Sequence, residues 1–194
     1  MDHIIYITDY LNSSIKVKSK ILENKSTLNL ISNAANIILE AYKNGNKLLI
    51  AGNGGSAADA QHIAAEFVSR FFYDRPGLPA LALTTDTSML TAIGNDYGFD
   101  MLFERQVQAQ GKMGDVLIGI STSGNSKNII NAVKKAKSMG ITTISFCGER
   151  GELREISDLS IEVPSSCTPY IQESHICIGH MICAIVEKTI YPKA

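Results

Sequence analysis

The sequence has no excess of charge of either sign and no long hydrophobic run. Its 194 residues include 18 basic and 19 acidic side chains, which gives a net charge of −1. This balance argues against a basic surface for nucleic acid or for anionic lipid. No apolar run reaches the roughly 18 residues of a membrane-spanning helix, and the start MDHIIYITDYLNSS is not typical of a signal peptide. We therefore expect a globular protein of about one domain that binds neither nucleic acid nor membrane.

Paired cysteines are also missing. The four cysteines are Cys147, Cys167, Cys177 and Cys183, and no two of them form a CxxC motif. This spacing disfavours a disulfide framework. We expect free, partly buried thiols that pack as small apolar side chains in a reducing compartment, which indicates a cytoplasmic protein.

Glycine and proline are absent from residues 6–44, where helical spacing predicts a weaker helix over 6–22 followed by a stronger one. After Gly45, short apolar runs alternate with helical segments. The predicted strands are 47–52, 78–84, 115–121, 141–147 and 159–163, and the predicted helices are 56–72, 87–94, 99–110, 125–139 and 168–190. This alternation predicts βαβ units and a parallel sheet covered on both faces, in one α/β domain with helical additions at both ends.

The segment STSGNS, residues 121–126, follows a predicted strand and opens a helix. It supplies four hydroxyl groups, on Ser121, Thr122, Ser123 and Ser126. The start of the helix adds free N–H groups and a favourable dipole, so the segment can surround a phosphate. It lacks the lysine of a P-loop, which favours a sugar phosphate over a nucleoside triphosphate. For any single serine, helix capping is the simpler explanation, whereas the whole cluster favours phosphate binding.

A second specialised turn, GNGGS, occupies residues 52–56. Its three glycines permit unusual backbone conformations and close approach of a ligand, and Ser56 can cap the following helix. The turn matches the dinucleotide-binding fingerprint only in part, because no clear strand with an acidic residue follows about 20 positions on. Ligands of open α/β sheets bind beyond the carboxyl ends of the strands, where both turns lie.

The helix after the second turn carries His62 and Glu66. Their i, i+4 spacing places both on one face, where they can ligate one metal ion or transfer protons. The HExxH motif of zinc proteases is absent. Taken alone, HxxxE is more typical of a surface ion pair.

Polar residues also interrupt the apolar helix 168–190. On an ideal helix, Glu173 and His180 differ by about 20° and Gln172 and His180 by about 80°, so spacing alone pairs Glu173 with His180 more readily. Helix geometry leaves this choice open. Taken alone, His175 is more typical of a buried structural histidine.

Four motifs together resemble one known family. AGNGGSAADAQHIAAEF, TAIGNDYGFDMLFERQV, GDVLIGISTSGNS and IQESHICIGH occur in the order expected for the phosphoheptose isomerases of the SIS (sugar isomerase) superfamily. The resemblance covers roughly residues 5–190. It implies a flavodoxin-like three-layer sandwich with a five-stranded parallel sheet, and a homotetramer with sites near subunit interfaces. The chain would be a single SIS domain over 1–194, with N-terminal helices at about 6–44, an α/β core at about 47–164 and a C-terminal helix at about 168–190.

The resemblance also implies roles for individual residues. It implies one zinc ion per subunit, held by His62, Glu66, Gln172 and His180, which would settle the choice on the last helix in favour of Gln172. Glu66 and His180 would be the catalytic acid/base pair. The implied substrate contacts are Asn53, Gly54, Gly55, Ser56, Glu66, Asn95, Asp96, Ser121, Thr122, Ser123, Ser126 and Gln172. Many members carry a bulkier or polar pair where this chain has Ala57 and Ala58, a departure that removes no implied ligand.

The implied reaction is the isomerisation of sedoheptulose 7-phosphate to D-glycero-D-manno-heptose 7-phosphate, which supplies heptose for bacterial lipopolysaccharide or capsule. Two other functions exist among similar proteins: a non-catalytic SIS protein that binds a replication initiator, and a regulator that senses a sugar phosphate. A non-catalytic protein would not need all four implied zinc ligands together, so their presence favours the enzyme.

Overall fold

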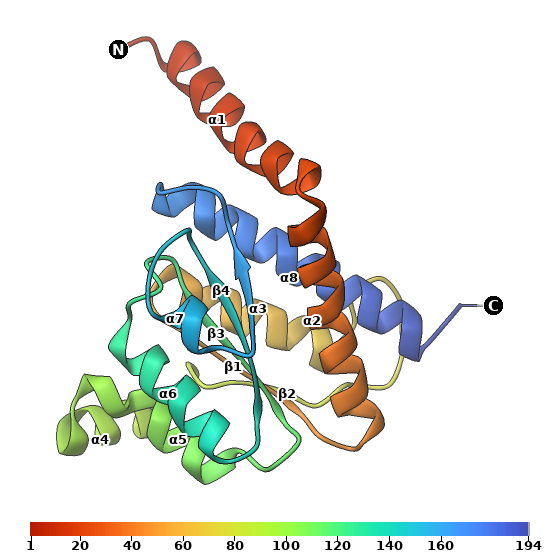
Figure 1. The fold of residues 1–194 in the computed structure, drawn as a ribbon, viewed down its shortest axis with the longest axis vertical. Helices are drawn as coiled ribbons and strands as arrows, with labels where there is room; N and C mark the ends of the chain where they lie inside the picture. The colour runs from red at the N-terminus through yellow and green to blue at the C-terminus, as the bar shows by residue number, and fades with distance from the viewer. Residues whose placement is uncertain (194) are drawn as a thin grey trace.

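The computed structural model describes residues 1–193 and contains one five-stranded, fully parallel sheet (Figure 1). The strands are β1 (Leu48–Gly52), β2 (Ala80–Ala82), β3 (Val116–Ser121), β4 (Thr142–Cys147) and β5 (Leu159–Glu162). Their order in the sheet is β2-β1-β3-β4-β5. The predicted parallel α/β fold is confirmed.

Helices pack on both faces of the sheet. They are α1 (His3–Glu23), α2 (Lys25–Lys43), α3 (Gly55–Val68), α4 (Thr87–Tyr97), α5 (Leu102–Gln110), α6 (Lys127–Ser138), α7 (Leu153–Ile156) and α8 (Thr168–Ile190), with a 3-10 turn at Phe99–Met101. Side chains of β1 alternate between two cores: Leu48 and Ile50 contact the apolar residues of α2, α3 and α8, whereas Leu49 and Ala51 contact those of α5 and α6. This alternation gives the three layers of the predicted sandwich.

The strand order places the two specialised turns side by side. In a 2-1-3-4-5 sheet, the order reverses between the first and third strands, and ligands bind at that point. Here β1 pairs with β3 along its length, with Gly52 opposite Ile120. The chain leaves β1 toward α3 on one face and leaves β3 toward α6 on the other, so the two turns meet at this point of the sheet.

The element boundaries differ from the predictions at several places. The helix expected over 56–72 ends at Val68, because the chain turns there into a loop held by Arg75. The first helix begins at His3, where Asp2 accepts hydrogen bonds from the first turn, and it ends at Glu23, just before Asn24, which caps α2. The four-residue helix α7 is missing from the prediction, because it is too short to show helical periodicity.

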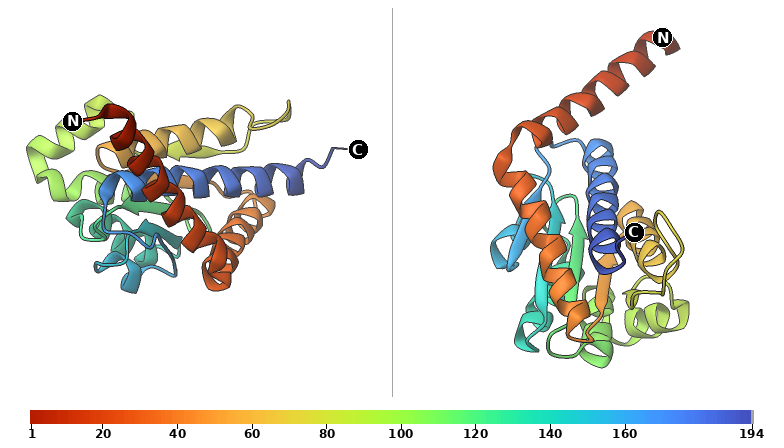
Figure 2. Two further views of the ribbon diagram at one scale, coloured as in Figure 1. Left: turned by 90° about the horizontal axis from the view of Figure 1, so that it is seen from above. Right: turned by 90° about the vertical axis from the view of Figure 1, so that its right-hand side faces the viewer.

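The first helix extends beyond the rest of the fold. The N-terminal half of α1 projects away from the sheet and its covering helices, as Figures 1 and 2 show. Ile4, Ile7, Leu11 and Ile15 on this helix are each more than half exposed. None of the described helices is both long and apolar enough to cross a membrane.

The thiols are all free among the described residues. Cys147 and Cys183 are buried and Cys177 is partly buried, as predicted, whereas Cys167 is exposed just before α8. The core-packing interpretation therefore fails for Cys167.

Candidate active site

The glycine turn, residues 52–55, connects β1 to α3. Gly54 is the N-cap of α3 and has a φ of 54°, a left-handed conformation that favours glycine. No side chain caps this helix, and Ser56 lies buried in its first turn, so the predicted capping role of Ser56 is wrong. A Cβ atom on Gly55 would lie 2.5 Å from Nε2 of Gln172, which shows how closely α8 approaches the turn.

His62, Glu66 and His180 meet between α3 and α8, and we call them the His–Glu–His group. Nε2 of His62 lies 3.0 Å from Oε1 of Glu66 and 3.1 Å from Nε2 of His180. One potential ligand atom from each residue falls within 4.8 Å of the other two. Gly179 allows this approach, because a Cβ atom there would lie 2.6 Å from Cδ1 of Ile63. The sequence prediction that His62 and Glu66 share one face is confirmed.

Gln172 and Glu173 point in different directions from α8. Glu173 accepts hydrogen bonds from Tyr10, Ser14 and Lys18 of α1, and the bonds from Ser14 and Tyr10 hold the pKa of its carboxyl below the usual range. Gln172 instead lies against the glycine turn. The alternative that spacing favoured, a pair of Glu173 with His180, is therefore wrong.

His175 is a buried residue on a third side of α8. It is fully buried, and its Nε2 lies 3.3 Å from the carbonyl oxygen of Cys147 at the end of β4. Burial lowers the pKa of His175 to about 4, so its imidazole is neutral at pH 7. The interpretation of His175 as a structural histidine agrees with this environment.

Asp59 is a residue that the sequence reasoning missed. It lies one turn before His62 on α3, and its Oδ2 is buried without a hydrogen-bond partner among the described residues. Burial raises the pKa of Asp59 to about 6, and the nearby His62 opposes this shift. The i, i+3 spacing to His62 was the available signal.

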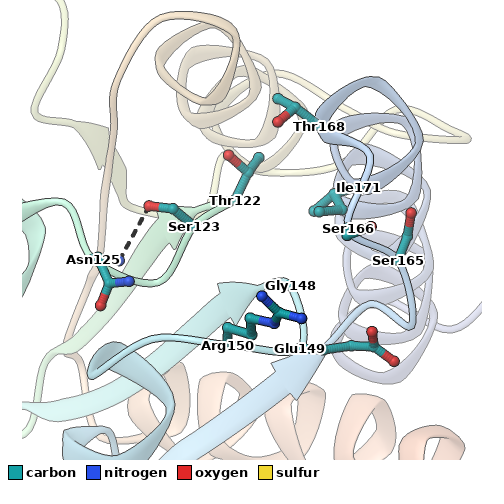
Figure 3. Close-up of a pocket in the computed structure, with 10 residues that line it drawn as sticks. All are labelled: Thr122, Ser123, Asn125, Gly148, Glu149, Arg150, Ser165, Ser166, Thr168 and Ile171. Atoms are coloured by element: carbon teal, nitrogen blue, oxygen red, sulfur yellow. Dashed lines mark hydrogen bonds between the residues drawn. The ribbon is translucent and has the colours of Figure 1, made fainter.

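The hydroxyl loop, residues 121–126, opens onto a cavity of about 300 Å³ at the carboxyl ends of β3 and β4 (Figure 3). The cavity is lined by Thr122, Ser123, Asn125, Gly148, Glu149, Arg150, Ser165, Ser166, Thr168 and Ile171. Two of the four predicted residues, Thr122 and Ser123, line this cavity, and Oγ of Ser123 accepts a hydrogen bond from the backbone N–H of Asn125 at 3.2 Å. The hydroxyl groups of the other two, Ser121 and Ser126, lie 2.9 Å apart, and Ser126 is the N-cap of α6 without a side-chain capping bond.

Arg150 supplies a positive charge to the cavity that the sequence reasoning did not assign. It follows β4, whose carboxyl end adjoins that of β3. Position after a neighbouring parallel strand was the signal that could have found it.

Asn53 links the glycine turn to the hydroxyl loop. Its side-chain amide exchanges two hydrogen bonds of 2.9 Å with that of the buried Asn128, in the first turn of α6. Asn53 and Gly54 line a second cavity of about 370 Å³, together with residues of α4. The predicted sugar contacts Asn95 and Asp96 are exposed on α4, bond to each other at 2.8 Å, and line neither of these two cavities.

The fold and the paired turns place this chain in a known class. The profile of the SIS domain matches residues 9–148, so the chain belongs to the SIS-domain proteins.

Closer relatives narrow this class. The chain is 60% identical over 189 residues to phosphoheptose isomerase 2 of Campylobacter jejuni, covering 97% of this chain and 94% of the relative. It is 60% identical over 187 residues to the phosphoheptose isomerase of Aneurinibacillus thermoaerophilus, covering 96% and 94%. The phosphoheptose isomerase structure from Francisella tularensis has a TM-score of 0.92 at 37% identity and covers 97% of this chain and 100% of that one. The chain belongs to the phosphoheptose isomerase family.

Proposed function

We propose that this protein interconverts sedoheptulose 7-phosphate and D-glycero-D-manno-heptose 7-phosphate. The His–Glu–His group carries this proposal, because it places a carboxylate and two imidazoles within hydrogen-bonding distance between α3 and α8. Family membership at 60% identity supports the same activity. The product would supply heptose for bacterial lipopolysaccharide or capsule.

Glu66 and His180 are the proposed acid/base pair. Conversion of a 2-ketose to an aldose moves a proton between C1 and C2 and relocates the carbonyl group. One residue takes the acidic C–H proton while another protonates the carbonyl oxygen. Glu66 projects from α3 and His180 from α8, so the two groups reach the reacting carbons from different elements. An enediol is the expected intermediate, and it predicts exchange of the migrating hydrogen with solvent.

A zinc ion fits the donor set of the His–Glu–His group. Imidazole nitrogen and carboxylate oxygen are common zinc ligands, and catalytic zinc sites typically use three protein ligands. His62, Glu66 and His180 would hold the ion, with Gln172 as the proposed fourth ligand, one ion per subunit. When bound, zinc would act as a Lewis acid that polarises the substrate carbonyl.

The phosphate would bind at the hydroxyl loop. Thr122 and Ser123 line its cavity, Ser121 and Ser126 bond to each other within the loop, and the start of α6 adds N–H groups. Binding energy from this remote group would fix the reacting carbons near Glu66. We propose Asn53, Gly54, Gly55, Ser56, Asn95 and Asp96 as the sugar contacts, together with Glu66 and Gln172.

A homotetramer with sites near subunit interfaces is part of the proposal. The projecting, apolar half of α1 supports it, because such a surface is otherwise exposed to water (Figure 2). We also propose that residues 1–194 act as a single domain in the cytoplasm, which the free thiols support.

One assay tests the activity and the metal separately. Purified protein is incubated with sedoheptulose 7-phosphate, with and without prior removal of metal by a chelator. We expect turnover by the zinc-loaded protein and its loss after removal. No turnover by zinc-loaded protein would refute the isomerase, whereas turnover unaffected by rigorous metal removal would refute only the zinc.

A further inference from the structure

A buried ion pair joins the loop after α3 to the last turns of α8. Nε of Arg75 donates to Oε1 of Glu187 at 3.1 Å, and the two side chains are only 2% and 1% exposed. Arg75 belongs to the loop after α3, whereas Glu187 lies near the end of α8. The pair therefore joins the two helices that carry His62, Glu66 and His180.

Arg75 holds the end of α3. Its Nη2 donates to the backbone carbonyl of Glu66 at 2.7 Å, and its Nη1 donates to the carbonyls of Phe67 and Ser69. The last carbonyls of a helix have no partners within the helix, so the guanidinium satisfies them with charge-assisted bonds. The guanidinium thus holds the backbone carbonyl of Glu66, whose carboxylate belongs to the His–Glu–His group.

Glu187 supports His180, the member of the His–Glu–His group that lies on α8. It accepts the backbone N–H of Phe71 at 2.8 Å and of Phe72 at 2.7 Å. The ring of Phe71 then packs on the imidazole of His180, with ring centroids 5.5 Å apart. One buried pair thus reaches Glu66 through its carbonyl and His180 through an aromatic ring.

We propose that Arg75 and Glu187, with Phe71, form a clamp that positions Glu66 and His180 for zinc binding and proton transfer. The proposal rests on the proposed function for the identity of the ligand. The clamp residues act through other residues and do not touch substrate. Supporting residues of this kind typically change metal affinity or activity by about 10- to 100-fold when removed.

The test compares Arg75→Met and Phe71→Leu with the control Asp115→Asn in the full chain. Asp115 is fully buried and pairs with Lys47 at 2.6 Å, and its carboxylate bonds to Lys47 and Lys112 but to none of the clamp residues, so its loss destabilises the fold without removing a clamp contact. Zinc affinity is measured by competition with a coloured chelator, histidine environments by NMR, and stability by thermal unfolding. All binding is measured well below each unfolding midpoint.

We expect Arg75→Met to weaken zinc binding about 10- to 100-fold and to lower kcat, with KM changed less than about threefold. Phe71→Leu should lose less zinc affinity than Arg75→Met, and it should shift the NMR signal of the His180 imidazole. It also decides the proposal if Arg75→Met does not fold. Asp115→Asn should lose stability while retaining zinc affinity within about twofold.

If Arg75→Met and Phe71→Leu had the same zinc affinities and imidazole signals as Asp115→Asn, the clamp would be overturned, since the ion pair would then serve stability alone. If the unaltered protein neither binds zinc nor isomerises the substrate, the proposed function fails. The imidazole signals of His62 and His180 then decide the clamp by themselves.

Discussion

The hydroxyl loop and the His–Glu–His group differ in how the chain builds them. The loop consists of six consecutive residues, from the last residue of β3 to the residue before α6. The His–Glu–His group joins His62 and His180, which are 118 positions apart and meet only because α3 packs on α8. The loop is therefore a product of local sequence, whereas the group depends on long-range packing, on Gly179 and on the loop after α3. Changes in the two regions should have different kinetic consequences.

The largest effect is expected in the long-range group. Glu66→Gln should lower kcat by about 10²- to 10⁴-fold, because an amide cannot take the proton, while the fold is retained. The matched control is Glu40→Gln on the exposed surface of α2, which should retain full activity. A Glu66→Gln rate close to that of the control would remove Glu66 from its proposed role.

Neighbouring residues on α8 give a finer comparison. Gln172→Ala should lower zinc affinity and kcat by about tenfold, since Gln172 is the proposed fourth zinc ligand. Glu173→Gln should instead lower thermal stability with little change in kcat, because Glu173 bonds to Tyr10 and Ser14 of α1. Chelator competition and thermal unfolding distinguish the two, and the reverse pattern would exchange their roles.

Substitutions in the hydroxyl loop should change KM more than kcat. Ser123→Ala removes a hydroxyl from a residue that lines the cavity, so KM should rise several-fold with kcat nearly unchanged. The control is Ser138→Ala, at the exposed far end of α6, whose hydroxyl bonds only to the carbonyl of Lys135 among the described residues. Steady-state kinetics measure both, and a fall in kcat without a rise in KM would contradict phosphate binding at this loop.

The smallest effect on the site is expected at His175, which lies outside both regions. Its folded-state pKa of about 4 is below the ordinary value of 6.5, so the unfolded chain binds more protons between these values. The free energy of unfolding should fall as pH drops from about 6.5 to about 4, and should be unaffected by this group above that window. Urea unfolding at several pH values should show a smaller fall for His175→Gln than for His3→Gln, an exposed control. Parallel curves would contradict this assignment.

The same contrast explains what sequence reasoning could predict. Apolar periodicity and glycine punctuation predicted the parallel sheet and the position of STSGNS, because strands, turns and helix starts are local. Spacing on α8 favoured Glu173 over Gln172, since an ideal helix does not indicate which face meets α1 and which meets the glycine turn. Arg150 and Arg75 were missed because their partners come from distant segments.

The paired amides of Asn53 and Asn128 have a mechanical consequence. Because each side chain both donates to and accepts from the other, rotating either amide breaks two bonds at once. The glycine turn and the start of α6 are therefore tied together. A movement of α4, whose residues are all at least partly exposed, would widen the cavity that it shares with Asn53 and Gly54 without breaking this linkage.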